Sequence, residues 1–151
     1  MKYNIRLVRD NEETILDSLF ARLIKNDKCY DLNIKDNLTM SGFFSKRVKD
    51  EDSIIFVAVV EDEIVGYIYG YVQNDNKIKI ELEAYIDSLF VDEEYRKQGI
   101  GNNLINKFIE EAKYRGVKYI YVENKVDNEI ARFLYEKLDF NIFIENRRKE
   151  I

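Results

Sequence analysis

The sequence lacks histidine and proline and holds a single cysteine, and each shortage narrows the class of protein. Without histidine there is no Ser-His-Asp or Cys-His catalysis, and most zinc sites lose a ligand. Any proton transfer must therefore use Asp, Glu, Tyr, Lys, Cys or water. Without proline, the turns must rest on glycine, asparagine and aspartate. Because Cys29 has no partner for an internal disulfide, a reducing, cytoplasmic setting is expected.

The chain also lacks long apolar runs and an excess of positive charge. No run approaches the roughly 18 residues that span a bilayer. The start, MKYNIRLVRDNEE, has no apolar segment typical of a signal peptide. We therefore expect no membrane partner, and the net charge of −5 argues against a nucleic-acid partner. Residues 51–94 hold twelve acids and two lysines, a net charge of −10, which favours a cationic partner.

What is present has the composition of one globular domain over residues 1–151. Apolar residues make up 46% of the chain and aromatic residues 13%, which is enough for a hydrophobic core. Alternating β-branched and aromatic runs predict strands, and apolar residues spaced three or four apart predict helices. The predicted strands cover residues 2–10, 53–60, 63–72, 78–91, 117–124 and 140–145, and the predicted helices cover residues 10–26, 40–50, 100–115 and 127–138.

The order of these elements predicts the fold class. Residues 53–60 and 63–72 flank the acidic turn at residues 61–63, so they are expected to form a hairpin. The first half of the chain is then an antiparallel meander. The second half alternates strand, helix, strand, helix and strand, which favours a partly parallel sheet with right-handed crossovers. The class is therefore α/β, or α+β with a mixed sheet.

The stretch EEYRKQGIGNNL, residues 93–104, lies between the end of a predicted strand and the start of a predicted helix. A helix N-terminus offers free N–H groups and the positive end of the dipole. Gly99 and Gly101 let an anion approach the backbone closely, and Arg96 and Lys97 add cationic donors. The stretch predicts a phosphate site, with a simple tight turn as the alternative. It lacks the glycines of a dinucleotide fingerprint and the lysine of a P-loop.

A longer stretch, AYIDSLFVDEEYRKQGIGNNLINKFIEEA, resembles motif A of the GNAT superfamily of N-acetyltransferases. Its signature, Arg/Gln-x-x-Gly-x-Gly/Ala, is matched by residues 96–101. The sequence departs from the family at Glu93, where proline is frequent, and at Asp139, where glycine is usual. Aspartate takes the left-handed conformation less easily than glycine. The later stretch NEIARFLYEKLDF resembles motif B of the family, with matches at Asn128, Ala131, Tyr135 and Phe140.

The resemblance implies the family fold and an acyl-CoA donor. The fold is a mixed, mostly antiparallel sheet of about six or seven strands, flanked by about four helices, with a central parallel pair splayed apart. The donor is most often acetyl-CoA, and no metal is implied. The resemblance also implies which residues hold the donor. The pyrophosphate lies on the amides of Lys97, Gln98, Gly99, Ile100, Gly101 and Asn102 beside Arg96, and the pantetheine arm lies along Leu89, Phe90, Val91, Asn128, Ala131 and Tyr135.

Transfer of an acyl group to an amine needs a base for the amine and an acid for the departing thiolate. Tyr135 is the candidate acid, because a phenol has a pKa of about 10 against about 8.5 for a thiol. Ring packing alone is its alternative role. Asp87 is the candidate base, acting directly or through water, and Glu83 is the second choice. A backbone N–H near Phe90 or Val91 would polarise the carbonyl. The candidate substrate residues share one strand face while the pleat is regular, and they are Glu83, Tyr85 and Asp87.

The main prediction is an enzyme that transfers an acetyl group from acetyl-CoA to a primary amine by direct attack in a ternary complex. The acceptor is a small cationic amine, such as a polyamine or an aminoglycoside-like amine, or a protein N-terminus. A non-catalytic acyl-CoA-binding module is the alternative, because it needs the glycine loop but neither Tyr135 nor a carboxylate base. The net negative charge disfavours an enzyme that acts on aminoacyl-tRNA, because such an enzyme must bind an RNA backbone. A terminal strand at residues 140–145 offers an edge for pairing, and the resemblance adds the expectation of a homodimer.

Overall fold

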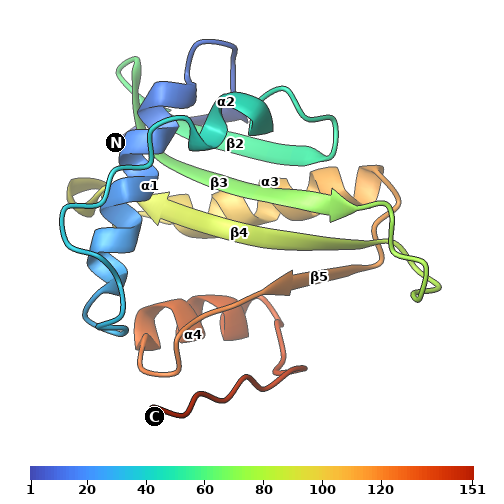
Figure 1. Cartoon of the computed structure of the whole chain (residues 1–151). Coiled ribbons are helices and arrows are strands. Elements are labelled where there is room, and N and C mark those ends of the chain that lie inside the picture. Colours follow the sequence, from blue (N-terminus) through green and yellow to red (C-terminus); the bar gives the residue numbers. More distant parts are fainter.

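The computed structural model describes the whole chain, residues 1–151, and contains one five-stranded sheet. The strands follow one another in chain order across the sheet, and helices lie on both faces (Figure 1). This architecture confirms the predicted α/β class with a mixed sheet. No helix has the length and apolarity needed to cross a membrane. The strands are β1 (Asn4–Leu7), β2 (Ser53–Val60), β3 (Glu63–Gln73), β4 (Glu83–Val91) and β5 (Tyr119–Val122), and the helices are α1 (Glu13–Asp27), α2 (Phe43–Arg47), α3 (Ile100–Tyr114) and α4 (Glu129–Lys137).

The strands β1 to β4 form the antiparallel meander that the sequence predicts. Val60 at the end of β2 pairs with Glu63 at the start of β3, so only two residues make the turn. These residues, Glu61 and Asp62, have φ angles of 47° and 68°. A two-residue turn with both φ angles positive matches the twist of the flanking strands. The acidic hairpin turn is therefore confirmed.

A β-bulge interrupts the pairing of β3 with β4. Gly70 lies opposite Ile86, whereas the residue before Gly70 lies opposite Ser88, so Asp87 is the extra residue. Gly70 is required here because a Cβ at this position would collide with the carbonyl oxygen of Tyr85. The bulge places the Asp87 carboxylate at the point where the side chains of β4 exchange faces of the sheet.

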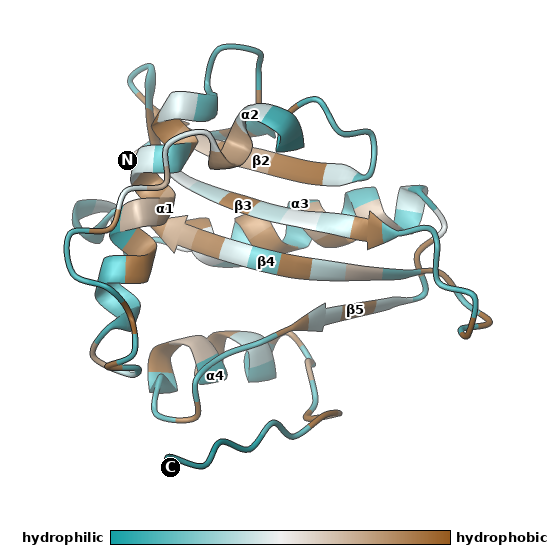
Figure 2. Cartoon of the chain, in the orientation of Figure 1, coloured by the Kyte–Doolittle hydropathy of each residue, from teal (hydrophilic) through white to brown (hydrophobic).

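Each face of the sheet has its own hydrophobic core. The core under α3 includes Phe108, and the core under α1 and α2 includes Phe44, both fully buried. Bands of apolar colour recur along β2, β3 and β4 in Figure 2, and these three strands take part in both cores. The bulge divides β4 between them. Ala84 and Ile86, before the bulge, pack on the α3 side, whereas Phe90, after it, packs on the α1 side.

The strands β4 and β5 run parallel but pair over a short stretch only. Glu83 to Ile86 pair with Tyr119 to Val122. Beyond this ladder the strands separate, and β5 leads away toward α4 (Figure 1). Residues 87–91 of β4 therefore have no strand partner on this side, and the predicted splayed parallel pair is confirmed.

The prediction of a last strand at residues 140–145 is wrong, because these residues form no strand. Ile142, Phe143 and Ile144 are 88%, 72% and 72% exposed, so their apolar pattern is not buried in a core. Strand propensity produces a strand only where a neighbour supplies matching backbone groups and burial. The sheet therefore ends at β5 with five strands, not six or seven. The parallel pair accordingly lies at one edge of the sheet and not at its centre.

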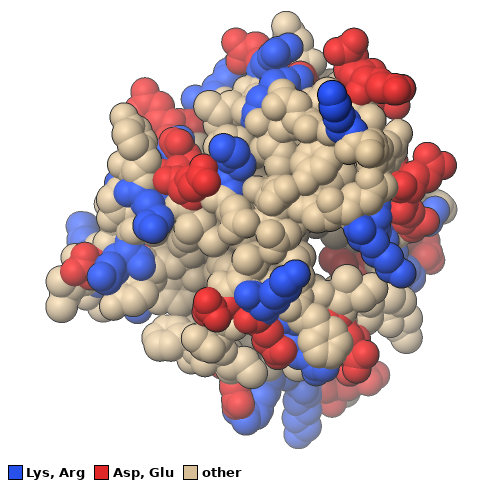
Figure 3. Space-filling view, turned by 180° about the vertical axis from the view of Figure 1, so that it is seen from behind, with Lys and Arg blue, Asp and Glu red and all other residues tan.

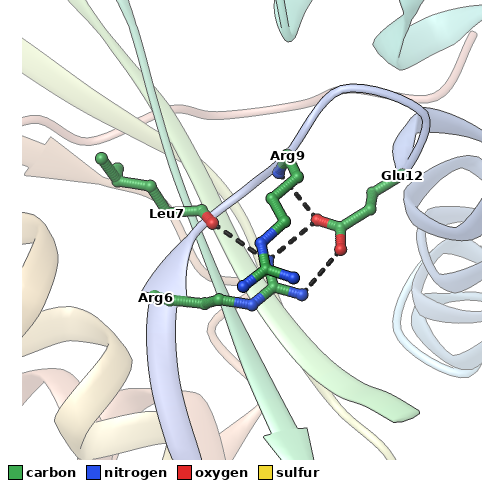
Figure 4. Close-up of polar contacts among 4 residues, drawn as sticks. All are labelled: Arg6, Leu7, Arg9 and Glu12. Atoms are coloured by element: carbon green, nitrogen blue, oxygen red, sulfur yellow. Dashed lines mark hydrogen bonds and ion pairs between the residues drawn. The ribbon is translucent and has the colours of Figure 1, made fainter. Parts of the chain in front are cut away.

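An ion pair fixes the junction between β1 and α1 (Figure 4). Arg6 donates from Nη1 to Oε2 of Glu12 at 3.1 Å and from Nη2 to Oε1 at 2.7 Å. The Glu12 carboxylate also accepts a 2.7 Å hydrogen bond from the backbone N–H of Arg9, and Arg6 Nη1 reaches the carbonyl oxygen of Leu7 at 3.1 Å. The side chains of Arg6 and Glu12 are only 20% and 15% exposed. The hydrogen bonds from Arg6 hold the pKa of the Glu12 carboxyl below its usual value.

Candidate functional site

The unpaired stretch of β4 presents backbone groups to the gap beside β5. The N–H of Asp92 donates to the carbonyl oxygen of Val65 at 2.8 Å, which places that N–H on the β3 side. Because successive residues point their backbone groups to opposite edges of a strand, Leu89 and Val91 face the open edge. The carbonyl oxygen of Val91 accepts a 2.8 Å hydrogen bond from Arg96 Nε. The N–H and carbonyl of Leu89 and the N–H of Val91 are left for a ligand lying along the strand.

The molecule is hollowed where these strands separate. Seen from the side of α3, the surface in Figure 3 has a hollow between the part that carries the sheet and the lower part that carries α4. Lysine and arginine side chains lie at its edge in this view. Two other hollows, of about 550 Å³ and 450 Å³, lie beside β1, and Tyr3 and Asn4 line both of them. Neither of these reaches the open edge of β4, so the gap is the better candidate site.

The loop before α3 exposes a run of backbone donors. None of the N–H groups from Lys97 to Asn102 donates to an acceptor within the chain. Lys97 and Gly99 have φ angles of 61° and 83°, in the left-handed region. Turns of this kind gather successive N–H groups into an anion-binding concavity. The helix begins at Ile100, which is 1% exposed and anchors the first turn in the core. We call residues 97–102 the amide loop.

Two arginines lie near the end of β4, and the sequence indicated only Arg96. The Arg96 guanidinium lies 5.8 Å from the centroid of the Phe90 ring, and the guanidinium of Arg22 in α1 lies 5.0 Å from the same centroid. Arg22 Nη1 also pairs with Asp92 Oδ2 at 3.1 Å and holds the pKa of that carboxyl below its usual value. Arg22 and Asp92 are 70 residues apart in the sequence, so no local pattern could join them. Both arginines add positive charge at the end of β4.

The helix α4 uses its two polar motif B residues in different ways. Asn128 caps the helix, because its Oδ1 accepts a 3.1 Å hydrogen bond from the N–H of Ala131, and its Nδ2 is left for another partner. Tyr135 is 9% exposed and packs edge-on against Phe140, with ring centroids 5.8 Å apart. Burial raises the pKa of Tyr135 to about 12, and the charge of Asp27 adds to the rise. The Tyr135 phenol is therefore protonated at neutral pH.

Asp87 projects from the bulge, so it is not part of a regular row of carboxylates on β4. Its side chain reaches solvent, but the surrounding chain displaces enough water to raise its pKa. The charge of Glu123, a residue that sequence reasoning missed, adds to the rise, and the guanidinium of Arg47 opposes it. A carboxylate whose pKa is shifted toward neutrality suits a general base.

Glu83 lies before the bulge and is buried, with 3% of its surface exposed. The hydroxyl of Tyr121 donates a hydrogen bond to Glu83 Oε2, and Oε1 has no partner. This hydrogen bond is the main cause that raises the pKa of Tyr121 to about 12. Because Glu83 is enclosed and already holds a phenol, Asp87 is the better placed of the two predicted bases.

Tyrosine rings form a row across β3, β4 and β5. The centroids of Tyr69 and Tyr71 are 6.4 Å apart, those of Tyr71 and Tyr85 are 5.5 Å apart, and those of Tyr85 and Tyr121 are 5.1 Å apart. Phe143 extends the row, 5.8 Å from Tyr121. Tyr69 belongs to the core under α1 and α2, so the row lies on the face opposite α3. Sequence reasoning missed Tyr121 and Phe143, whose places depend on how β5 aligns with β4.

Known proteins resemble this chain in sequence and in fold. An uncharacterized N-acetyltransferase of Methanocaldococcus jannaschii is 32% identical over 142 residues, which cover 91% of this chain and 60% of that protein. An N-alpha-acetyltransferase of Saccharolobus solfataricus is 33% identical over 104 residues, 65% of this chain and 62% of that protein. The chain thus spans about three fifths of the length of these relatives. A solved aminoglycoside acetyltransferase from an uncultured soil sample shares the fold, with a TM-score of 0.76, 24% identity and coverage of 100% of this chain and 99% of its own.

A mixed sheet with a splayed parallel pair and an amide loop at the start of the following helix defines the acetyltransferase class of α/β domain. The chain belongs to the acetyltransferase (GNAT) family, whose model matches residues 16–140. The resemblance that the two sequence motifs indicate is therefore confirmed, and the description of the family as acetyltransferases agrees with the expected type of enzyme.

Proposed function

We propose that the protein transfers an acetyl group from acetyl-CoA to a primary amine, and that this amine is the N-terminus of a polypeptide. Membership of the acetyltransferase family supports the reaction. The name of the Saccharolobus relative, an N-alpha-acetyltransferase, supports the acceptor. The single observation that carries the proposal is that the amide loop adjoins the open backbone edge at Leu89 and Val91.

The groups around the gap fit acetyl-CoA. A pyrophosphate needs several N–H donors and positive charge, and the amide loop with Arg96 offers both. The pantetheine arm contains two amide groups, which need strand-like partners, and Leu89 and Val91 offer these at the open edge. Asn128 Nδ2, with Ala131 behind it, is the polar group that α4 contributes. When bound, acetyl-CoA supplies an acetyl thioester to this gap.

The chain's own residues supply the proton transfers. Asp87 takes a proton from the ammonium form of the amine, directly or through water, and so frees its nitrogen for attack. The new N–C bond forms as the C–S bond breaks, and Tyr135 gives its proton to the departing thiolate. The second proton of the attacking nitrogen then passes through water to the Tyr135 phenolate, which leaves a neutral amide and restores the phenol. The N–H of Val91 pairs with the arm, and the N–H of Leu89, on the same open edge and nearer to Asp87, polarises the acetyl carbonyl. Phe90 does not suit this task, because by the same alternation its N–H faces β3.

The acceptor would lie on the face opposite α3, which carries the predicted substrate residues Glu83, Tyr85 and Asp87. Glu83, Asp87 and Glu123 put three acids on or near this face, where Arg47 is the cation that acts on Asp87. Such a balance attracts a positively charged amine. The expected cytoplasmic setting, the expected lack of a nucleic-acid partner and the expected homodimer stay predictions.

The direct test is an acceptor screen with acetyl-CoA, read by the release of CoA. Short peptides with a free N-terminus would be compared with the same peptides blocked at the N-terminus, and with spermidine and an aminoglycoside. We expect release with free peptides and none with blocked ones. Turnover on spermidine or the aminoglycoside alone would overturn the peptide acceptor. Binding of acetyl-CoA without turnover on any amine would instead favour the non-catalytic module.

A further inference from the structure

A carboxylate oxygen is left without a partner inside the proposed acceptor face. Glu83 is 3% exposed, its Oε2 accepts from the Tyr121 hydroxyl, and its Oε1 accepts from nothing. A buried oxygen of this kind has lost its water and gained no donor in return, which is unfavourable. A ligand that brings a positively charged N–H group to Oε1 would remove this penalty, whereas a neutral apolar group would not.

The Glu83 side chain lies on the acceptor side of the sheet. Ala84 and Ile86 pack in the core under α3, so by alternation Glu83 and Tyr85 point to the opposite face. Tyr85 stacks between Tyr71 and Tyr121, and so belongs to the tyrosine row. The partnerless oxygen thus lies beside aromatic rings, along which the aliphatic stem of a lysine packs well.

We propose that Glu83 binds the positively charged side chain of a lysine or arginine a few residues downstream in the acceptor polypeptide. This inference rests on the proposed function and adds a sequence preference to it. Glu83 precedes Asp87 by four residues along β4, which is at most about 13 Å at the usual strand rise, because the bulge shortens the step to Asp87. An extended acceptor chain with its N-terminal amine at Asp87 covers that distance in about four residues. The reach of a lysine side chain widens the match to about the third to fifth residue.

Access to Oε1 requires little disruption. Phe143 packs on Tyr121, whose hydroxyl is bonded to Glu83, and Phe143 is itself 72% exposed. No backbone N–H of residues 141–151 donates to another backbone group. An ion pair between Arg148 and Asp31, 2.9 Å long, ties this segment to the loop after α1. An arriving side chain can therefore displace Phe143 without breaking a backbone hydrogen bond.

The test compares peptide acceptors that differ in one charge. A series of peptides with an N-terminal alanine would carry either lysine or norleucine at each of positions two to six, and kcat/KM would be measured with acetyl-CoA. We expect lysine to exceed norleucine by about ten- to a hundredfold near positions three to five, the range of a hydrogen bond to a charged group. In Glu83→Gln this ratio should fall to near one. Glu81→Gln removes the same charge from an exposed neighbour and should keep the ratio.

Each outcome decides between the proposals. A wild-type protein that acetylates all the peptides with no preference for lysine at any position would overturn the role of Glu83, and this result needs no variant to fold. Loss of the preference in Glu81→Gln as well as in Glu83→Gln would assign it to long-range charge and overturn a specific contact. Acetylation of spermidine but of no peptide would overturn the polypeptide acceptor. Failure to acetylate any amine, with acetyl-CoA still bound, would contradict the proposed function itself.

Discussion

Arg47 Nη1 donates a 2.6 Å hydrogen bond to the carbonyl oxygen of Phe43, and the Arg47 guanidinium lies 3.6 Å from the centroid of the Phe43 ring. These contacts hold a positive charge near Asp87, where it opposes the rise in pKa that burial causes. Arg47→Met should therefore raise the pKa of Asp87 further, and the acidic limb of kcat/KM against pH should move to higher pH. Lys46→Met removes an equal charge from an exposed position of α2 and should leave the limb in place. A limb that moves in neither variant would contradict Asp87 as the base.

Asp87→Asn should separate activity from stability. Burial raises the folded-state pKa of Asp87 above its unfolded value of about 3.9. The stability that this group contributes is therefore fully present below the unfolded pKa and is lost as the pH rises through the folded pKa. At pH 7 the variant should unfold at the same temperature as the wild type or higher, while kcat falls by about 10²- to 10⁴-fold. Thermal unfolding and steady-state kinetics on the same samples check both parts, and a variant of normal activity would remove Asp87 from the mechanism.

Tyr135→Phe should lower kcat and leave the KM for acetyl-CoA nearly unchanged. The substitution removes the proposed acid but keeps the ring that packs against Phe140. We expect a loss of about 10²-fold or more in kcat, the usual contribution of a general acid. Tyr114→Phe, at a tyrosine that is 88% exposed, is the matched control and should behave as the wild type. If Tyr135→Phe keeps full activity, the phenol serves packing alone.

Gly99→Ala should weaken binding of acetyl-CoA more than it weakens the fold. Gly99 has a φ of 83°, and an added Cβ would lie 3.9 Å from the Tyr3 hydroxyl, so alanine meets backbone strain of roughly 1–2 kcal/mol, which disturbs the left-handed turn of the amide loop. Gly116→Ala provides the control, because Gly116 has a φ of 85° and nothing within 4 Å. The two variants should lose similar free energy of unfolding, while the KM for acetyl-CoA rises by about tenfold in Gly99→Ala alone, a change of about 1.4 kcal/mol. Equal KM values in both would place the donor away from the loop.

Glu12→Gln should destabilise the protein in a pH-dependent way. The Arg6 hydrogen bonds lower the folded-state pKa of Glu12, so its contribution is present above the unfolded pKa of about 4.3 and is lost as the pH falls through the folded pKa. At pH 7 we expect a loss of about 1–3 kcal/mol in the free energy of unfolding, and the difference should shrink in acid. Glu13→Gln, at the next position and without an ion pair, is the control for charge at the helix start. Denaturant titrations at several pH values would measure the effect, and a constant difference at all of them would refute the ion-pair explanation.

The parts of the fold that could be predicted are those that neighbouring residues determine. The turn at Glu61 and Asp62 has no alternative between two β-branched runs, and the structure gives both residues positive φ angles. Gly99 marks the start of α3 because few other residues adopt its φ angle. Asp139, where the family usually has glycine, also has a positive φ of 64°, as the motif requires. These features follow from the conformational preferences of neighbouring residues, so short stretches of sequence predict them.

The parts that could not be predicted depend on how distant segments align. A single extra residue at Asp87 changes which side chains of β4 face the acceptor, and an alternating apolar pattern does not show where such a slip occurs. The pairing of Glu83 with Tyr121 depends on the alignment of β4 with β5. Residues 140–145 illustrate the opposite error, because their alternation predicts a strand that has no neighbour to pair with.

The open edge of β4 has a consequence for solubility. An unpaired strand edge normally serves as a template on which other chains aggregate. Here the unpaired stretch, residues 87–91, is an inner edge, since β5 and α4 stand opposite it (Figure 1). The outer strands of the sheet, β1 and β5, are each only four residues long. The unpaired backbone groups of β4 thus lie where a narrow ligand can enter, whereas β5 and α4 block the approach of a second polypeptide strand.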